Sequence, residues 1–173
     1  MNNAGREMNV NSMGFMRRTL TRVVSMKKAL VMLATLITMS GCGGEQLPLA
    51  DGTQTRIDDW QGRWVVINYW AEWCAPCREE IPELNRLYSE AGAAGPLVVG
   101  VNYDNLKPAD LQPLIQRMQI GFPVLQNDPM QRFGYERPEI LPTTVLLKPD
   151  LSVGKVLRGP QSAESIRKVI ESL

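Results

Sequence analysis

The sequence predicts an α/β fold, a three-layer sandwich in which a mixed β-sheet is flanked by helices. Three observations predict it. Two runs of apolar, mostly β-branched or aromatic residues, 64–70 and 97–101, are typical of strands buried in a parallel sheet. Stripes of apolar residues at helical spacing follow each of them. Residues 143–158 have the pattern of an antiparallel hairpin, so the sheet is expected to be mixed.

The first half of the expected domain leads from strand to helix. Residues 49–59 indicate a short strand or turn region, and 60–63 turn the chain into the central strand 64–70. Pro76 suits the first turn of the following helix, where a missing N–H is tolerated, and Gly92 suits its end. The apolar stripe of this helix consists of Ile81, Leu84, Leu87 and Tyr88.

The second half repeats the strand and helix pattern and then turns back. After the strand 97–101, a second helix is predicted by Leu111, Leu114, Ile115 and Met118, which stand at positions i, i+3, i+4 and i+7. Residues 122–125 indicate a short strand, and 129–134 a helical turn. The hairpin 143–158 is followed by a break at Gly159-Pro160 and by a closing helix, whose stripe is Ile166, Val169, Ile170 and Leu173.

The first 41 residues have the order of a secretory signal peptide. The basic pair at 27–28 precedes an apolar run over 29–39, and small residues follow at 40–41. The apolar run is shorter than the roughly 20 residues of a bilayer-spanning helix. We therefore expect residues 1–41 to be a signal peptide, for which Met26 offers an alternative start.

Cys42 follows this segment directly. Residues 39–42 resemble a bacterial lipobox, in which the cysteine is acylated, and a plain transmembrane anchor with an incidental cysteine is the alternative. Either anchor predicts an extracytoplasmic domain at the membrane. An Asp directly after the acylated cysteine would resemble an inner-membrane retention signal. This chain has Gly43 at that position, so the outer membrane is expected. Residues 42–46 would form the lipidated start and tether, and 47–173 the domain.

The charge distribution argues against a nucleic-acid-binding protein. The net charge of the 173 residues is +1, but six basic residues and one acidic residue precede Cys42. The remaining chain carries 13 basic and 17 acidic residues and is therefore mildly acidic. The length suits one domain with an extension, which we expect to be a monomer.

The stretch Trp73-Cys74-Ala75-Pro76-Cys77 carries the expected chemistry. Two cysteines at this spacing are typical of thiol–disulfide exchange, although half of a zinc site has the same pattern. The chain has no His, and its one other cysteine is Cys42, so a metal site is the weaker interpretation and no cofactor is expected. A static structural disulfide is also a weak interpretation, because so small a ring stabilises little.

Several segments around this motif resemble a known family. Residues 70–77, preceded by a buried strand and followed far downstream by 141–144, resemble thioredoxin-fold proteins. Residues 66–70, 78–82, 99–102 and 141–144 are similar to the TlpA-like branch of redoxins, which are membrane-tethered, extracytoplasmic thiol–disulfide oxidoreductases. The resemblance covers about 47–173 and implies a thioredoxin-like sandwich.

The resemblance implies roles for the motif residues. Cys74, at the junction of strand and helix, would be the attacking thiol, because helix N–H groups and the helix dipole favour its thiolate. Cys77 would resolve the mixed disulfide. Pro76 would set the spacing and stiffness between the thiols, and Trp73 would cover the disulfide and contact partners. Trp70 is expected to pack beneath.

The resemblance also implies supporting residues. Pro142 would be a cis proline beside the disulfide, with the backbone at Leu141 free to pair with a substrate strand; an ordinary trans proline at a strand start is the alternative. Glu80, one turn after Cys77, resembles a proton shuttle, whereas a solvated helical Glu is the plainer interpretation. Thioredoxin has a buried acid where this chain has Asn68, which cannot transfer a proton.

The predicted function is reduction of disulfides in exported proteins, with re-reduction by a membrane thiol donor. Two alternatives remain open. A thiol peroxidase of the same fold would have Thr three residues before its reactive cysteine, where this chain has Ala71. A non-catalytic or copper(I)-handling protein would bind metal through Cys74 and Cys77, with no His to complete the site.

Overall fold

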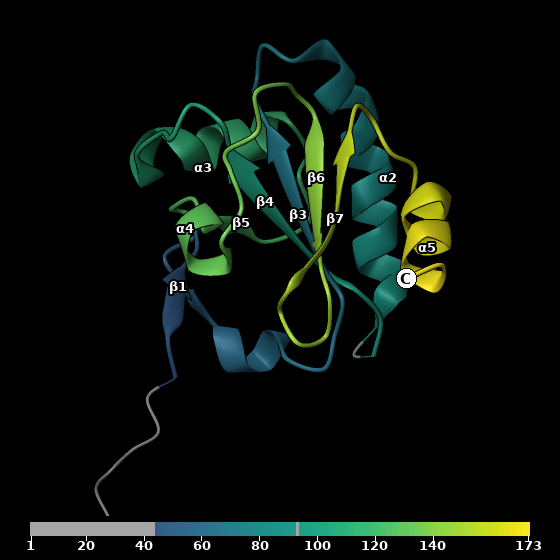
Figure 1. The fold of residues 1–173 in the computed structure, drawn as a ribbon. Helices are drawn as coiled ribbons and strands as arrows, with labels where there is room; N and C mark the ends of the chain where they lie inside the picture. The colour runs from purple at the N-terminus through teal and green to yellow at the C-terminus, as the bar shows by residue number, and fades with distance from the viewer. Residues whose placement is uncertain (1–43, 93) are drawn as a thin grey trace, which may run out of the picture. The chain divides into compact units, whose positions relative to one another are not determined.

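The computed structural model describes residues 44–92 and 94–173 (Figure 1). The predicted signal peptide and Cys42 lie outside the described residues. The described chain is built on a five-stranded sheet with the strand order β5-β4-β3-β6-β7. Its strands are β3 (Val65–Trp70), β4 (Leu97–Asn102), β5 (Val124–Leu125), β6 (Thr143–Leu147) and β7 (Val153–Arg158).

The sheet is mixed, as predicted. Strand β4 runs parallel to both β3 and β5, while β6 runs antiparallel to β3 and to β7. The parallel pair β3 and β4 is joined by a helix, which is the connection that parallel strands require. The tight turn between β6 and β7 forms the predicted hairpin.

Within the described residues, four helices flank the sheet (Figure 1). They are α2 (Ala75–Ala91), α3 (Pro108–Arg117), the short α4 (Met130–Phe133) and α5 (Ala163–Glu171). A two-stranded antiparallel sheet, β1 (Gln46–Pro48) and β2 (Gln54–Arg56), and a 3-10 turn, η2 (Ile57–Trp60), precede β3. The predicted α/β sandwich with a mixed sheet flanked by helices is confirmed.

Two hydrophobic clusters cover the two faces of the sheet. Successive side chains of β3 point to opposite faces, so Val66 and Trp70 pack with α2, α3 and α5, whereas Ile67 and Tyr69 pack on the other side. The second cluster is completed by η2 through Trp60 and by the residues around α4. Because both faces are covered, all six residues of β3 are buried, as its nearly all-apolar composition predicted.

Helix α2 positions the cysteines. Pro76 lies in its first turn, and the helix ends at Gly92, which has a positive φ of 57° that glycine adopts without strain. Of the predicted stripe, Ile81, Leu84 and Leu87 are buried, whereas Tyr88 lies at the edge of the stripe and is 38% exposed.

We expect Leu84→Ala to lower the free energy of unfolding by about 2–5 kcal/mol, because Leu84 is fully buried between α2 and the sheet and its truncation leaves a cavity. Urea denaturation followed by circular dichroism measures the loss. Tyr88→Ala on the same helix is the control and should cost less. Equal losses for the two variants would contradict the assignment of the buried face.

Candidate redox site

Cys74 and Cys77 form a disulfide at the start of α2, with their Cα atoms 5.3 Å apart. Cys74 occupies the N-cap position of the helix, directly after the short loop that leaves β3. Its Sγ accepts a hydrogen bond from the backbone N–H of Cys77 at 3.2 Å. When the pair is reduced, the same N–H and the positive end of the helix dipole can stabilise a thiolate at Cys74.

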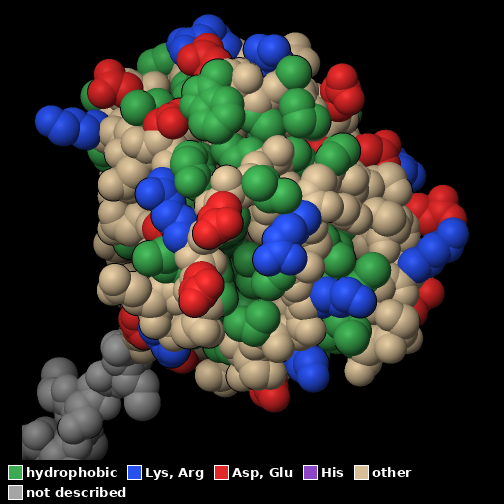
Figure 2. Space-filling view, turned by 45° about the horizontal axis from the view of Figure 1, so that its top comes forward, with side chains coloured by type: hydrophobic (Ala, Val, Ile, Leu, Met, Phe, Trp, Pro, Cys, Tyr) green, Lys and Arg blue, Asp and Glu red, His purple; other side chains and the backbone are tan. Residues whose placement is uncertain are grey.

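Trp73 stands beside the disulfide and is 64% exposed. Its indole N–H donates to Asp104 Oδ1 at 3.1 Å, and its ring meets that of Tyr103 edge to face, with the centroids 6.4 Å apart. Cys74 and Cys77 are themselves buried, and Trp70 is fully buried, as predicted. Figure 2, which brings the top of Figure 1 forward, shows hydrophobic side chains gathered among charged ones at this end.

The Leu141–Pro142 peptide bond is cis, in agreement with the expectation for Pro142. In the register of β3 and β6, Thr143 lies opposite Tyr69, so Pro142 is at the end of the sheet where β3 leads toward Cys74. The carbonyl of Pro142 accepts a hydrogen bond from Gly159 N at 2.9 Å. The fold thus brings Cys74 and Pro142, 68 positions apart in sequence, to the same end of the sheet.

Glu80 lies on the buried face of α2, with 2% of its surface exposed, so the interpretation as a solvated helical residue is wrong. Its Oε2 accepts from Asn68 Nδ2 at 2.9 Å, and its Oε1 accepts from the backbone N–H of Gln161 at 3.0 Å. Asn68 is fully buried on β3 and also donates to Thr144 Oγ1 at 3.2 Å. Glu80, the candidate proton shuttle, is therefore in direct contact with Asn68, which stands where thioredoxin has a buried acid.

The burial of Glu80 favours its protonated form, against the hydrogen bonds that its carboxylate accepts. Burial raises the pKa of Glu80 to about 7, and the hydrogen bonds from Asn68, Gln161 and Thr144 oppose that rise. A carboxyl group with a pKa near 7 can both accept and donate a proton at neutral pH.

Sequence reasoning missed Thr144 and Gln161. Thr144 could have been found, because it follows Pro142 by two residues and pairs with Asn68 across the two strands. Gln161 carries no such signal, since its contribution is a backbone N–H that any residue except proline supplies.

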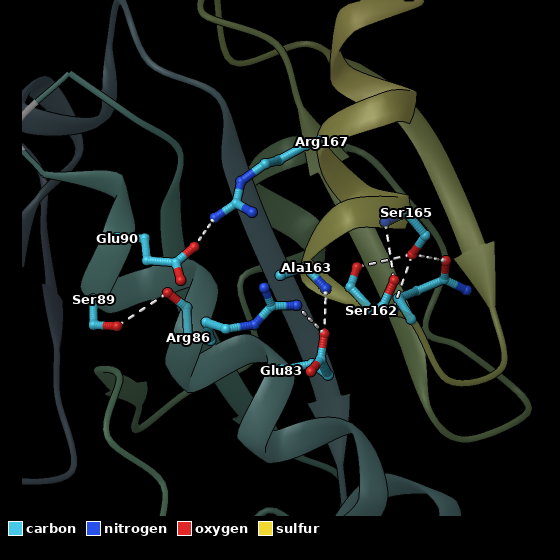
Figure 3. Close-up of polar contacts among 9 residues, drawn as sticks. Glu83, Arg86, Ser89, Glu90, Ser162, Ala163, Ser165 and Arg167 are labelled. Atoms are coloured by element: carbon cyan, nitrogen blue, oxygen red, sulfur yellow. Dashed lines mark hydrogen bonds and ion pairs between the residues drawn. The ribbon is translucent and has the colours of Figure 1, made fainter.

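Side chains of α2 also contact the start of α5 (Figure 3). Glu83 Oε2 accepts from Ala163 N at 3.0 Å and from Arg86 at 2.7 Å, and Arg167 pairs with Glu90. The hydrogen bond from Arg86 is the main reason that the pKa of Glu83 lies below its usual range. The C-terminal half of the helix that carries the cysteines is therefore attached to α5.

Known proteins are similar to this chain in sequence and in fold. The AhpC/TSA family model matches residues 45–156. The thiol-disulfide oxidoreductase ResA of Geobacillus thermodenitrificans is 29% identical over 126 residues, which are 71% of this chain and 70% of the relative. A DsbF homologue from Corynebacterium diphtheriae superposes with a TM-score of 0.63 at 26% identity, over 75% of this chain and 83% of that one. StoA from Bacillus subtilis, at 21% identity, shares the fold with a TM-score of 0.59 over 73% of this chain and 95% of its own.

These similarities confirm a thioredoxin-like fold and the activity of a thiol–disulfide oxidoreductase, with Cys74 and Cys77 as the pair at CxxC spacing. The family match covers most of the described chain and includes both cysteines, Glu80 and Pro142. The chain belongs to the AhpC/TSA family.

Proposed function

We propose that the protein reduces disulfides of exported proteins through attack by Cys74 and resolution by Cys77. The Cys74 thiolate attacks one substrate sulfur, the substrate disulfide breaks, and a mixed disulfide forms. Cys77 then attacks Cys74 Sγ, which releases the substrate as a dithiol and leaves the Cys74–Cys77 disulfide. The N-cap position of Cys74, with its sulfur on the N–H of Cys77, carries this assignment.

Glu80 is proposed as the proton carrier of the pair. It follows Cys77 by three residues, so the two side chains project from the same side of α2, and burial brings its pKa to about 7. Resolution requires the thiol of Cys77 to lose a proton, which a carboxylate at this position can accept. Asn68 supports the carboxylate as a neutral donor and cannot replace it.

Substrate is proposed to bind across the loop before β6 and the loop before α2. The backbone at Leu141 would pair with an extended segment of the substrate, and the exposed ring of Trp73 would pack on it. Pro76, in the first turn of α2, would hold the spacing between the cysteines.

The proposed location is the extracytoplasmic face of a membrane, with the outer membrane favoured, through lipid on Cys42 and a short tether that ends before β1 begins at Gln46. The order of basic, apolar and small residues before Cys42 supports it. Among the described residues, the structure contains no helix with the length and apolarity needed to cross a bilayer. Each turnover uses two electrons, and we propose that a membrane thiol donor supplies them to the oxidised protein. The protein is proposed to act as a monomer.

The reduction potential of the Cys74–Cys77 pair tests the direction of transfer. We expect a value near or below about −270 mV, as found for reductants of this fold, measured by equilibration with glutathione or dithiothreitol buffers. A value near about −120 mV, typical of strong oxidants, would reverse the direction.

Tight stoichiometric copper(I) binding without reductase activity would favour the copper-handling alternative, and rapid turnover of hydrogen peroxide would favour a thiol peroxidase.

A further inference from the structure

The two oxygens of the Glu80 carboxylate accept hydrogen bonds from two different parts of the fold. Asn68 on β3 holds Oε2, and the backbone N–H of Gln161 holds Oε1 at 3.0 Å across 81 residues of sequence. Gln161 lies in the connection between β7 and α5, outside every motif that the sequence indicates. This connection therefore contacts the redox site through its backbone.

We infer that the backbone N–H of Gln161 is a positioning group of the redox site, which holds the Glu80 carboxylate in one orientation and stabilises its ionised form. The inference deepens the proposed function and rests on it for the role of Glu80 in proton transfer. The hydrogen bond from Gln161 N to Glu80 is independent of that role, because the segment 159–162 is fixed at both ends by other hydrogen bonds.

The first end of this segment is fixed at the cis proline. Gly159 has a φ of 84°, a conformation suited to glycine, and its N–H donates to the carbonyl of Pro142 at 2.9 Å. The side chain of Gln161 folds back, with Nε2 donating to Gly159 O at 3.1 Å, and its Oε1 accepts from Ser165 Oγ at 3.1 Å. The amide that faces Glu80 is thereby tied to the loop proposed to bind substrate.

The second end is fixed by the cap of α5 (Figure 3). Ser165 N donates to Ser162 Oγ at 3.0 Å, and Ser162 N donates to Ser165 Oγ at 2.9 Å, which forms a capping box. Ala163 N then donates to Glu83. Two backbone donors at the start of α5 thus meet two carboxylates one turn apart on α2, with Gln161 on Glu80 and Ala163 on Glu83.

In the part of the chain that the structure describes, the surroundings of Glu80 contain no charged group that could replace the hydrogen bond from Gln161 in stabilising the carboxylate. The residues that contact it from β3 and β6, Asn68 and Thr144, are neutral. Within residues 44–92 and 94–173, burial and three hydrogen bonds account for the pKa of Glu80, and no cation contributes to it. The titratable neighbours on the same face of α2 are Cys77, which is bonded in the disulfide, and Glu83, which is engaged by Arg86 and Ala163, whereas Arg78 and Glu79 are exposed. The carboxylate therefore depends on hydrogen bonds for its stabilisation.

The test removes this one N–H. Gln161→Pro lacks it, and an ester in place of the 160–161 peptide bond removes it without adding a ring. We expect either change to raise the pKa of Glu80 by about one pH unit or more, because a donor to a charged acceptor is lost. The measurement is an infrared titration of the carboxyl band in the full-length oxidised protein, with the band assigned by its loss in Glu80→Gln.

Gln161→Ala is the matched control, because it removes the side chain, with its contacts to Gly159 and Ser165, and keeps the N–H, so the pKa of Glu80 should rise much less than in the ester variant. An unchanged pKa in the ester variant would overturn the inference, as would an equal rise in Gln161→Ala. If the pKa rises while the pH profile of disulfide reduction stays unchanged, Gln161 positions Glu80 as inferred and the proton-carrier role of Glu80 fails instead.

Discussion

Cys74→Ser is expected to lower disulfide reduction by more than about 10³-fold, because an alcohol at this position offers no thiolate and forms no mixed disulfide. Cys74 carries the proposed first step, and its sulfur is the acceptor at the N-cap of α2. The rate of reduction of a protein disulfide substrate, measured with the reduced enzyme in single turnover, gives the loss.

Cys77→Ser distinguishes the two cysteines. This variant keeps the attacking thiol and loses the resolving one, so it should accumulate a mixed disulfide with the substrate, visible by mass spectrometry. Cys74→Ser should accumulate none. If the covalent complex forms through Cys77 in Cys74→Ser and not through Cys74 in Cys77→Ser, the two roles are reversed.

Glu80→Gln is expected to slow reduction at neutral pH by about 10²-fold and to remove the inflection near pH 7 from the pH–rate profile. An amide of nearly the same shape keeps the packing under α2 but accepts no proton. Titration of the cysteine thiols by alkylation rate provides a second readout. Thiol pKa values and a reduction rate equal to those of the parent would show that Glu80 is not the proton carrier.

The same substitution should change how stability depends on pH. The pKa of Glu80 is about 7 in the folded protein against 4.5 for the ordinary group, so between these values the folded state binds more protons than the unfolded state. The parent should therefore lose up to about 3 kcal/mol of stability as the pH rises from about 4.5 to above 7. Glu80→Gln should lack this component, and urea denaturation of the oxidised proteins across that range compares the two.

Much of the fold could be predicted from hydrophobic patterns. The run that became β3 contains no charged residue, and burial on both faces demands that composition. The stripe of α2 was predicted except at its margin, where Tyr88 is partly exposed, because a stripe gives the centre of a buried face better than its edges. Strand β2 falls in the region expected as a short strand or turn, whereas β1 lies before that region and was not expected, since three-residue strands are too short to show alternation.

The site divides in the same way. Cys74 and Cys77 could be identified as a redox pair from their spacing together with the absence of His from the chain, and their disulfide lies at the start of a helix, where Pro76 had indicated one. Composition alone makes Glu80 look exposed, since it follows Arg78 and Glu79, and only its spacing of three residues from Cys77 indicates the inward face on which it is buried. The contact with Asn68 depends on the packing of α2 over β3, which no local pattern encodes.

The neutrality of Asn68 has a consequence for how this protein titrates. An acid at that position would share protons with Glu80, and the pair would titrate in two macroscopic steps that belong to neither group. With Asn68, Thr144 and a backbone amide around it, Glu80 in the oxidised protein should follow a single-site curve of unit Hill slope. Reduction adds two titrating thiols beside it, so any broadening of that curve on reduction measures directly how strongly the carboxyl group and the cysteines are coupled.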